Sequence, residues 1–131
     1  MSPIVIDASV MAPAVADGGS DGDACRAALR GHQLVAPDLL RVEVLSALRR
    51  HVAGGSLTRR QAEHAVDDLL ALPITVYPTG PLLRRCWALR SNITTYDACY
   101  VALAEALGAP LLTADRRLAT SAGSQCTVEV V

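Results

Sequence analysis

Four carboxylates of this chain end or interrupt apolar runs, where a charge is out of place. They are Asp7, Glu43, Asp97 and Asp115. If the fold brings them together, each pair at 4 Å repels by about 1 kcal/mol in water and by about 4 kcal/mol at a partly buried site. A cation must offset that repulsion, and hard carboxylate oxygens suit Mg²⁺ or Mn²⁺. The four acids therefore indicate a metal-dependent site that acts on phosphate.

Two of the acids follow runs that have the length and composition of buried strands. Asp7 closes the apolar run 4–6, and Asp115 follows the run 111–114. In parallel α/β sheets, ligands bind beyond the carboxyl ends of the strands. We therefore expect both acids at the same edge of a sheet, which favours a functional site over coincidence.

The other two acids fall within helical patterns. Glu43 lies near the apolar stripe of its helix, and Asp97 opens the apolar pattern 96–103. An unpaired buried carboxylate is costly. If Glu43 has only a structural role, Arg41 or Arg50 is its expected partner, or it lies at the edge of the stripe.

Each acid also has a purely structural interpretation. Asp7 can cap the turn from strand to helix, and Asp115 can cap a short helix. Thr94 and Asp97 have the spacing of a capping box. A phosphatase of the Asp-x-Asp type is disfavoured, because position 9 is Ser. No single acid is decisive, so the combination carries the interpretation.

The size and composition indicate one globular domain spanning residues 1–131. No apolar stretch reaches the roughly 18 residues that span a membrane. A basic leader is absent before the acid at position 7, so a signal peptide is not expected and the cytoplasm is the expected compartment. The four cysteines are scattered without a C-x-x-C pair, which disfavours a zinc site or a disulfide framework.

The charge pattern excludes a strongly basic nucleic-acid binder. The net charge is −1, and all 12 basic residues are arginine. Arginine binds phosphate through a bidentate fork, although genomic base composition also explains the absence of lysine. The chain has three tyrosines, one tryptophan and no phenylalanine, so an aromatic platform for base stacking is not supported.

Strand patterns alternate with helical patterns along the chain. The expected strands are 4–6, 34–36, 74–77, 111–113 and 127–130. Seven helices are expected: a short one from Ser9, then about 23–30, 39–53 after a cap at Asp38, and a fourth to about 72 after a capping box at Thr58 and Gln61. The last three are 81–90, starting at Pro81, then 95–107, and a short helix after Asp115. Residues 18–22 are an expected loop. This alternation predicts an α/β domain with a mainly parallel sheet.

Four segments in this order resemble the PIN-domain ribonucleases, and among them the VapC-type toxins of type II toxin–antitoxin systems. They are residues 4–10, 36–44, 95–104 and 111–118. The resemblance covers essentially the whole chain. It implies a three-layer α/β/α sandwich whose acidic pocket is formed by Asp7, Glu43, Asp97 and Asp115. Ser9 and Thr113 match small hydroxyl residues beside two of those acids, and they would position a carboxylate, a water molecule or the substrate.

The resemblance further implies a Mg²⁺- or Mn²⁺-dependent endoribonuclease. Asp7, Asp97 and Asp115 would hold one or two metal ions, and Glu43 would orient a metal or its water. Water would attack in line, leaving a 5′-phosphate and a 3′-hydroxyl. Arg116 and Arg117 would hold the RNA backbone, unless they are ordinary solvated helix charges. A transfer RNA is one candidate substrate among several RNA classes.

The partners implied by the resemblance are an RNA substrate, a cognate VapB-type antitoxin and a second copy in a homodimer, with no membrane. The helical hairpin at 39–72 is the expected contact surface. A receiver domain is the first rival, but this chain has no lysine and only one acid after its first strand. A non-catalytic PIN-like RNA- or partner-binding regulatory domain is the second, and metal-dependent turnover separates it from the enzyme.

Overall fold

The centre of the molecule is a five-stranded parallel sheet. The computed structural model describes residues 1–121 and 123–131. The strands are β1 (Ser2–Ile6), β2 (His32–Pro37), β3 (Ile74–Tyr77), β4 (Leu111–Thr113) and β5 (Val128–Val130), in the order β3-β2-β1-β4-β5. Every pairing is parallel, which confirms the predicted sheet. β1 is central, and its last three residues are fully buried because both faces of the sheet are covered.

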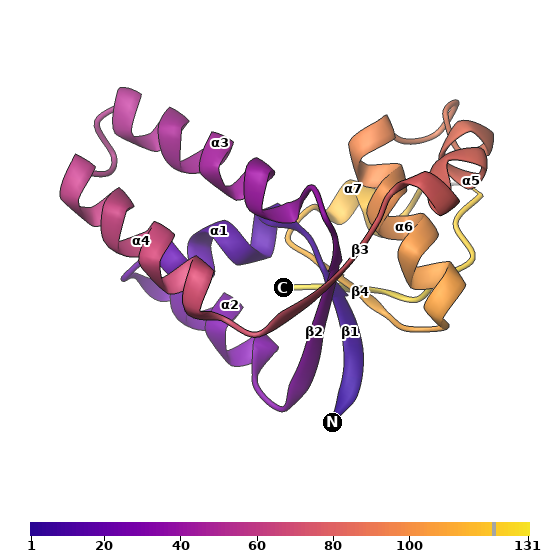
Figure 1. The fold of residues 1–131 in the computed structure, drawn as a ribbon, viewed down its shortest axis with the longest axis horizontal. Coiled ribbons are helices and arrows are strands. Elements are labelled where there is room, and N and C mark those ends of the chain that lie inside the picture. The colour runs from indigo at the N-terminus through magenta and orange to yellow at the C-terminus, as the bar shows by residue number, and fades with distance from the viewer. Residues whose placement is uncertain (122) are drawn as a thin grey trace.

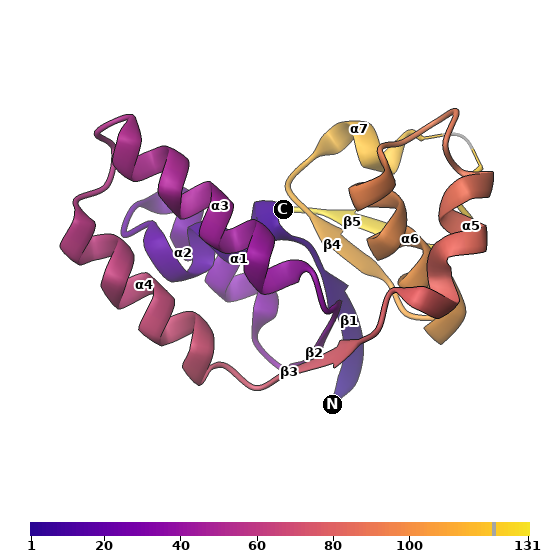
Figure 2. The same ribbon diagram turned by 45° about the horizontal axis from the view of Figure 1, so that its top comes forward.

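Helices cover both faces of this sheet. They are α1 (Ala8–Ala16), α2 (Ser20–Leu29), α3 (Leu40–Ala53), α4 (Arg59–Ala71), α5 (Leu83–Ala88), α6 (Thr95–Leu107) and α7 (Arg116–Ala119). Figures 1 and 2 show α1 to α4 gathered on one side of the strands and α5 to α7 on the other. The predicted three-layer α/β/α arrangement is therefore confirmed.

The strand order reverses direction at β1. The chain moves from β1 to β2 and β3 on one side, and then crosses to β4 and β5 on the other. Such a switch point leaves the loops after the two neighbouring strands free to diverge, and it is where ligands bind in open α/β sheets. Here those loops follow β1 and β4, and they carry Asp7 and Asp115.

Two helices have the local sequence signals that predicted them. Thr58 accepts a hydrogen bond from the backbone N–H of Gln61 at 3.1 Å, and Gln61 accepts one from the N–H of Thr58 at 2.9 Å. This confirms the capping box that starts α4. α6 covers the predicted range and ends at Gly108, whose φ of 61° is a left-handed cap.

Three predictions about helix ends are wrong. Asp38 does not cap α3, because its backbone N–H donates to the Tyr77 carbonyl at 2.9 Å and the helix starts two residues later. Residues 18–22 are not all loop, since α2 begins at Ser20. The helix expected from Pro81 is divided into a 3₁₀ turn, η1 (Gly80–Leu82), and the short α5.

The cysteines form no cross-link in the described residues. All four cysteines are free, and Cys86 and Cys99 approach in the core with their sulfur atoms 3.8 Å apart. Within residues 1–121 and 123–131, no helix has the length and apolar character needed to cross a membrane.

Candidate active site

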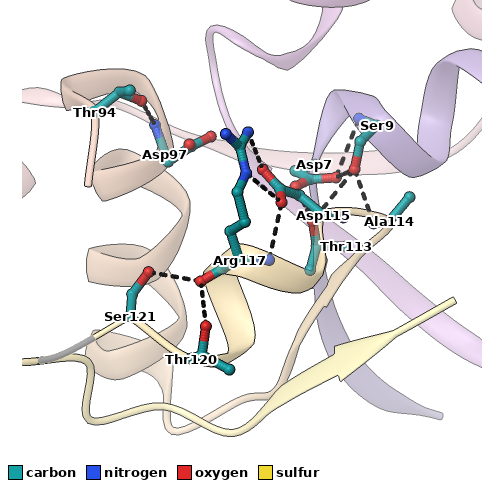
Figure 3. A network of polar contacts seen from close by, with 10 residues as sticks. All are labelled: Asp7, Ser9, Thr94, Asp97, Thr113, Ala114, Asp115, Arg117, Thr120 and Ser121. Carbon is teal, nitrogen blue, oxygen red and sulfur yellow. Dashed lines mark hydrogen bonds and ion pairs between the residues drawn. The ribbon is translucent and has the colours of Figure 1, made fainter. Parts of the chain in front are cut away.

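Asp7 is the buried acid at the end of β1, with only 5% of its surface exposed. It is the N-cap of α1 and accepts hydrogen bonds from the Ser9 N–H at 3.1 Å and the Ser9 hydroxyl at 2.6 Å. Its second oxygen accepts from the Thr113 hydroxyl at 2.6 Å. Figure 3 shows this network. The carboxylate therefore has a fixed position as well as a capping role.

The same two hydroxyl residues join the loop after β1 to the loop after β4. Ser9 Oγ accepts from the Ala114 N–H at 2.9 Å, and Thr113 Oγ1 accepts from the Asp115 N–H at 3.1 Å. Thr113 is fully buried, so it contacts Asp7 and the backbone rather than solvent. Ser9 is exposed and lines the cavity beside the acids. These bonds fix the position of the backbone at Ala114 and Asp115, just before α7.

Glu43 has a partner that the sequence interpretation missed. The Tyr100 hydroxyl, from α6, donates to Glu43 Oε1 at 2.6 Å. The two expected partners lie elsewhere: Arg50 donates to Ser46, and the buried Nε of Arg41 has no hydrogen-bond partner among the described residues. One signal was available, because Tyr100 lies one helical turn after Asp97 and so shares its face.

Asp97 and Asp115 lie at the starts of two helices. Asp97 is in the first turn of α6, where its N–H donates to Thr94 at 3.2 Å. Asp115 caps α7 and accepts the Arg117 guanidinium through two bonds of 3.1 and 3.0 Å. In Figure 3 the Arg117 side chain rises between the two acids. Arg116, the arginine named for substrate contact, is exposed one position earlier.

All four acids line one open cavity of about 670 Å³, which we call the acidic hollow. Its walls come from α1, α3, the start of α6 and the loop after β4. The side of α3 contributes Ser46, Arg50 and His51. The structure thus brings together the predicted acids from four separate segments at the switch point of the sheet.

Burial raises the pKa values of three of the four acids, and the charges of neighbouring acids add to the effect. Burial raises the pKa of Asp7 most, the Ser9 and Thr113 hydroxyls oppose it, and the charge of Asp97 adds to it. Burial likewise raises the pKa of Glu43, against the Tyr100 hydrogen bond, and the charges of Asp97 and Asp7 contribute. The pKa of Asp97 is raised by burial and by Asp115. Of these four acids, Asp115 alone has a lowered pKa, because it pairs with Arg117.

The donor set fits a hard divalent cation by its chemistry. Carboxylate oxygens are the ligands that Mg²⁺ and Mn²⁺ prefer, and a bound cation would offset both the burial of these charges, which raises their pKa values most, and the smaller repulsion between them. Across residues 1–121 and 123–131, however, no three acid, histidine or cysteine side chains are gathered tightly enough to form a metal cluster. The metal ligands predicted from the sequence stay a prediction.

The raised pKa values predict how stability varies with pH in the absence of metal. A carboxyl whose pKa is raised by folding contributes fully below its unfolded pKa of about 4, and its contribution is lost as the pH rises through the folded pKa. In EDTA, we expect Asp7→Asn to melt above the wild type by a margin that grows from about pH 4 to about pH 7. Thermal melts measure this margin, and a margin that does not vary with pH would contradict it.

Tyr100→Phe tests how Glu43 is held. The change deletes one buried hydroxyl that donates to a carboxylate, so we expect a loss of about 1–2 kcal/mol in the free energy of unfolding. If Glu43 acts in cleavage, its freed side chain should lower the rate roughly tenfold or more. Chemical denaturation and a cleavage assay give the two values. Tyr77→Phe is the matched control, since Tyr77 does not line the acidic hollow; equal effects of both changes would refute the role of Tyr100.

Comparison with known proteins places these features in a family. The PIN domain profile matches residues 4–123. Ribonuclease VapC1 of Mycobacterium tuberculosis is 42% identical over 132 residues, covering 100% of this chain and 99% of the relative.

Two solved structures share the fold. The structure of Mycobacterium tuberculosis VapC20, described as a Sarcin-Ricin loop cleaving toxin, has a TM-score of 0.71 at 17% identity, covering 92% of this chain and 95% of that chain. VapBC2 from Rickettsia felis, bound to a DNA fragment from the promoter, has a TM-score of 0.70 at 12% identity, covering 98% of both chains. These likenesses confirm the predicted architecture.

Proposed function

The chain belongs to the PIN-domain family, as a VapC-type ribonuclease of a toxin–antitoxin system, and on that premise we propose that its acidic hollow cleaves RNA with Mg²⁺ or Mn²⁺. The observation that carries the proposal is the convergence of Asp7, Glu43, Asp97 and Asp115 on one hollow. These acids come from the ends of two strands and from two helices. Helix capping alone does not require these four acids to lie together, and only packing between distant segments brings them to one cavity.

Each acid has a role that follows from its contacts. Asp7 is the fixed ligand, because three hydrogen bonds hold both of its oxygens. Asp97 and Asp115 complete the ligand set from the starts of α6 and α7. Glu43 has one oxygen bonded to Tyr100, so the other is free to orient water. These acids would hold a divalent cation, which would supply activation of the attacking water and offset the charge of the transition state.

The substrate is an RNA strand, and transfer RNA is one candidate. Hydrolysis by water in line with the leaving oxygen leaves a 5′-phosphate and a 3′-hydroxyl. No covalent enzyme intermediate is needed, because the acids hold and orient the reacting groups. The metal is needed for the reaction and is not part of the hydrophobic core. We therefore expect chelation to stop cleavage while the chain stays folded.

The proposed protein partner is a VapB-type antitoxin. The Rickettsia felis structure is a VapBC complex of the same fold. The hairpin formed by α3 and α4 has exposed apolar side chains that a partner would cover: Val42 and Leu70 are 67% and 66% exposed. A homodimer is also expected, and light scattering of the purified chain, alone and with the antitoxin encoded beside it, would measure both.

The experiment that tests the function is cleavage of total cellular RNA by the purified protein. The reactions contain Mg²⁺, Mn²⁺ or EDTA, and the ends of the products are sequenced. We expect discrete products that require metal and carry 5′-phosphates. Folded, antitoxin-free protein that cuts no RNA under any of these conditions would favour the non-catalytic binding role instead.

A further inference from the structure

A second cavity, of about 470 Å³, lies between the loop at 90–94 and α7. Most of the residues that line it have polar side chains, among them Arg90, Ser91, Asn92, Arg117 and Ser121, so we call it the polar hollow. Figure 3 shows Arg117 between the two acids, with its backbone carbonyl bonded to the Ser121 hydroxyl. The polar hollow shares Asp97 and Asp115 with the acidic hollow. The two cavities are therefore neighbours, with Asp97 and Asp115 lining both.

The two hollows differ in chemistry. Beyond its acids, the acidic hollow has apolar side chains from Ala12, Pro13, Val42 and the 64% exposed Tyr96, together with the polar Ser46, Arg50 and His51 of α3. Such a surface suits a base or a ribose. The polar hollow offers two guanidinium groups with hydroxyl and amide groups between them, which are the side chains that contact phosphates and sugars in nucleic-acid complexes.

The net charge of the chain makes local cations necessary for binding RNA. At −1, the whole molecule supplies no attractive field for a polyanion, and the four acids repel it at the site of cleavage. Positive groups must therefore stand immediately beside the acids. Arg90 and Arg117 line the polar hollow on one side, and Arg50 lines the acidic hollow on the other.

Arg90 is held in place for such a contact. Its Nη1 donates to the Trp87 carbonyl at 2.9 Å, and its guanidinium lies 4.5 Å from the centre of the Trp87 ring. A guanidinium stacked on an aromatic ring keeps donors free at its edge. Little conformational entropy is lost when a phosphate then binds.

Arg117 can change partners. It pairs with Asp115, but its side chain is 91% exposed, and exposed ion pairs contribute at most about 1 kcal/mol to stability. A phosphate entering the polar hollow, or a cation occupying Asp115, competes directly for that pair. Arg117 is thus a counter-ion of the free protein that becomes available to the substrate.

We propose that the polar hollow binds the sugar–phosphate backbone of the RNA on one side of the cleaved bond, with Arg90 and Arg117 as its phosphate ligands. Ser91 and Asn92 provide neutral hydrogen-bonding groups between them. This inference rests on the proposed function, since it assigns the RNA a path from the polar hollow across the acids into the acidic hollow. Contacts to the backbone position a strand without reading its sequence.

The test measures binding separately from cleavage. A fluorescent 12-mer of oligouridylate is titrated into Asp7→Asn protein by anisotropy, at salt concentrations between about 50 and 200 mM. Arg90→Gln and Arg117→Gln are added to that background, because glutamine keeps the side-chain stem and removes the charge. Arg60→Gln is the matched control, since Arg60 is exposed on α4 and lines neither hollow. Melting curves verify that every variant is folded.

We expect Arg90→Gln and Arg117→Gln each to weaken binding roughly three- to tenfold and to lower the slope of log affinity against log salt by about 0.7, the value for one lost phosphate contact on a single strand. Arg60→Gln should change neither. The result for Arg90→Gln is the less ambiguous of the two, because Arg117→Gln also leaves Asp115 without its counter-ion. If folded Arg90→Gln binds as Arg60→Gln does, the inference is wrong.

Cleavage of cellular RNA by the wild type separates the inference from the proposed function. If the wild type cleaves RNA and Arg90→Gln leaves the slope of log affinity against log salt unchanged, the proposed ribonuclease function is supported and the backbone-binding site is refuted. Absence of cleavage together with a reduced slope would retain an RNA-binding hollow and overturn the proposed chemistry.

Discussion

Asp7→Asn should lower RNA cleavage on the order of 10³-fold or more, because it removes one negative charge from the fixed ligand of the acidic hollow without changing its size. The asparagine oxygen can still accept from Ser9, so α1 keeps its cap. Its amide then meets the Thr113 hydroxyl, which can rotate its proton toward Ser9 at 3.2 Å. The fold should therefore survive, and in EDTA the variant should melt above the wild type once the pH is above about 4.

The measurement compares initial cleavage rates and the rise in melting temperature on adding Mn²⁺. A cation that binds only the folded state raises the melting temperature of the wild type, and the variant should lose most of that rise. Asp67→Asn is the matched control, since it makes the same change at an exposed position of α4. A folded Asp7→Asn protein that cuts RNA at the wild-type rate would exclude Asp7 from the reaction.

Gly22→Ala should destabilise the fold strongly although it adds a single methyl group and lies outside the site. Gly22 is buried in the first turn of α2. An added Cβ would lie 1.9 Å from the Asp17 carbonyl oxygen and 2.7 Å from its carbon, which are backbone atoms. Arg26 holds that same oxygen at 2.7 Å and the Ala14 carbonyl at 3.0 Å, so the end of α1 cannot easily retreat.

We expect Gly22→Ala to cost about 3 kcal/mol or more in the free energy of unfolding, as for an overpacked core. For a domain of this size that lowers the melting temperature by roughly 10 °C. Gly18→Ala is the control four residues earlier, because an added Cβ there meets nothing within 4 Å. It should change stability by less than about 0.5 kcal/mol, as is usual for exposed positions. Similar melting temperatures for the two variants would show that α1 and α2 can separate at little cost.

The sequence predicted the sheet and the positions of the acids because both depend on local patterns. Short apolar runs that end in an acid mark the carboxyl ends of β1 and β4, and the rule for ligand sites at such ends needs no knowledge of side-chain contacts. The capping box of α4 and the range of α6 are likewise set within a few residues of the chain.

The partners of the acids depend on packing between distant segments, and local patterns do not specify it. Tyr100 of α6 meets Glu43 of α3 across 57 residues, a contact that only the packing of distant segments creates. The choice of Arg117 over Arg116 depends on where a four-residue helix starts, and a shift of one residue turns a side chain by about 100°. The prediction that Gly22 lies in a loop was wrong. This glycine is part of α2 and lets the helix approach the backbone at the end of α1, where a side chain would not fit.

The bond between Thr113 and Asp7 spans 106 residues, and this has a consequence for the protein while it is being made. A ribosome delivers β1 and Asp7 first, but β4, Thr113 and Asp115 emerge only after α6. Until then Asp7 lacks a donor for its second oxygen, and the acidic hollow lacks one wall. A growing chain therefore lacks a complete acidic hollow until β4 and the start of α7 have been made, so the site forms only late in synthesis.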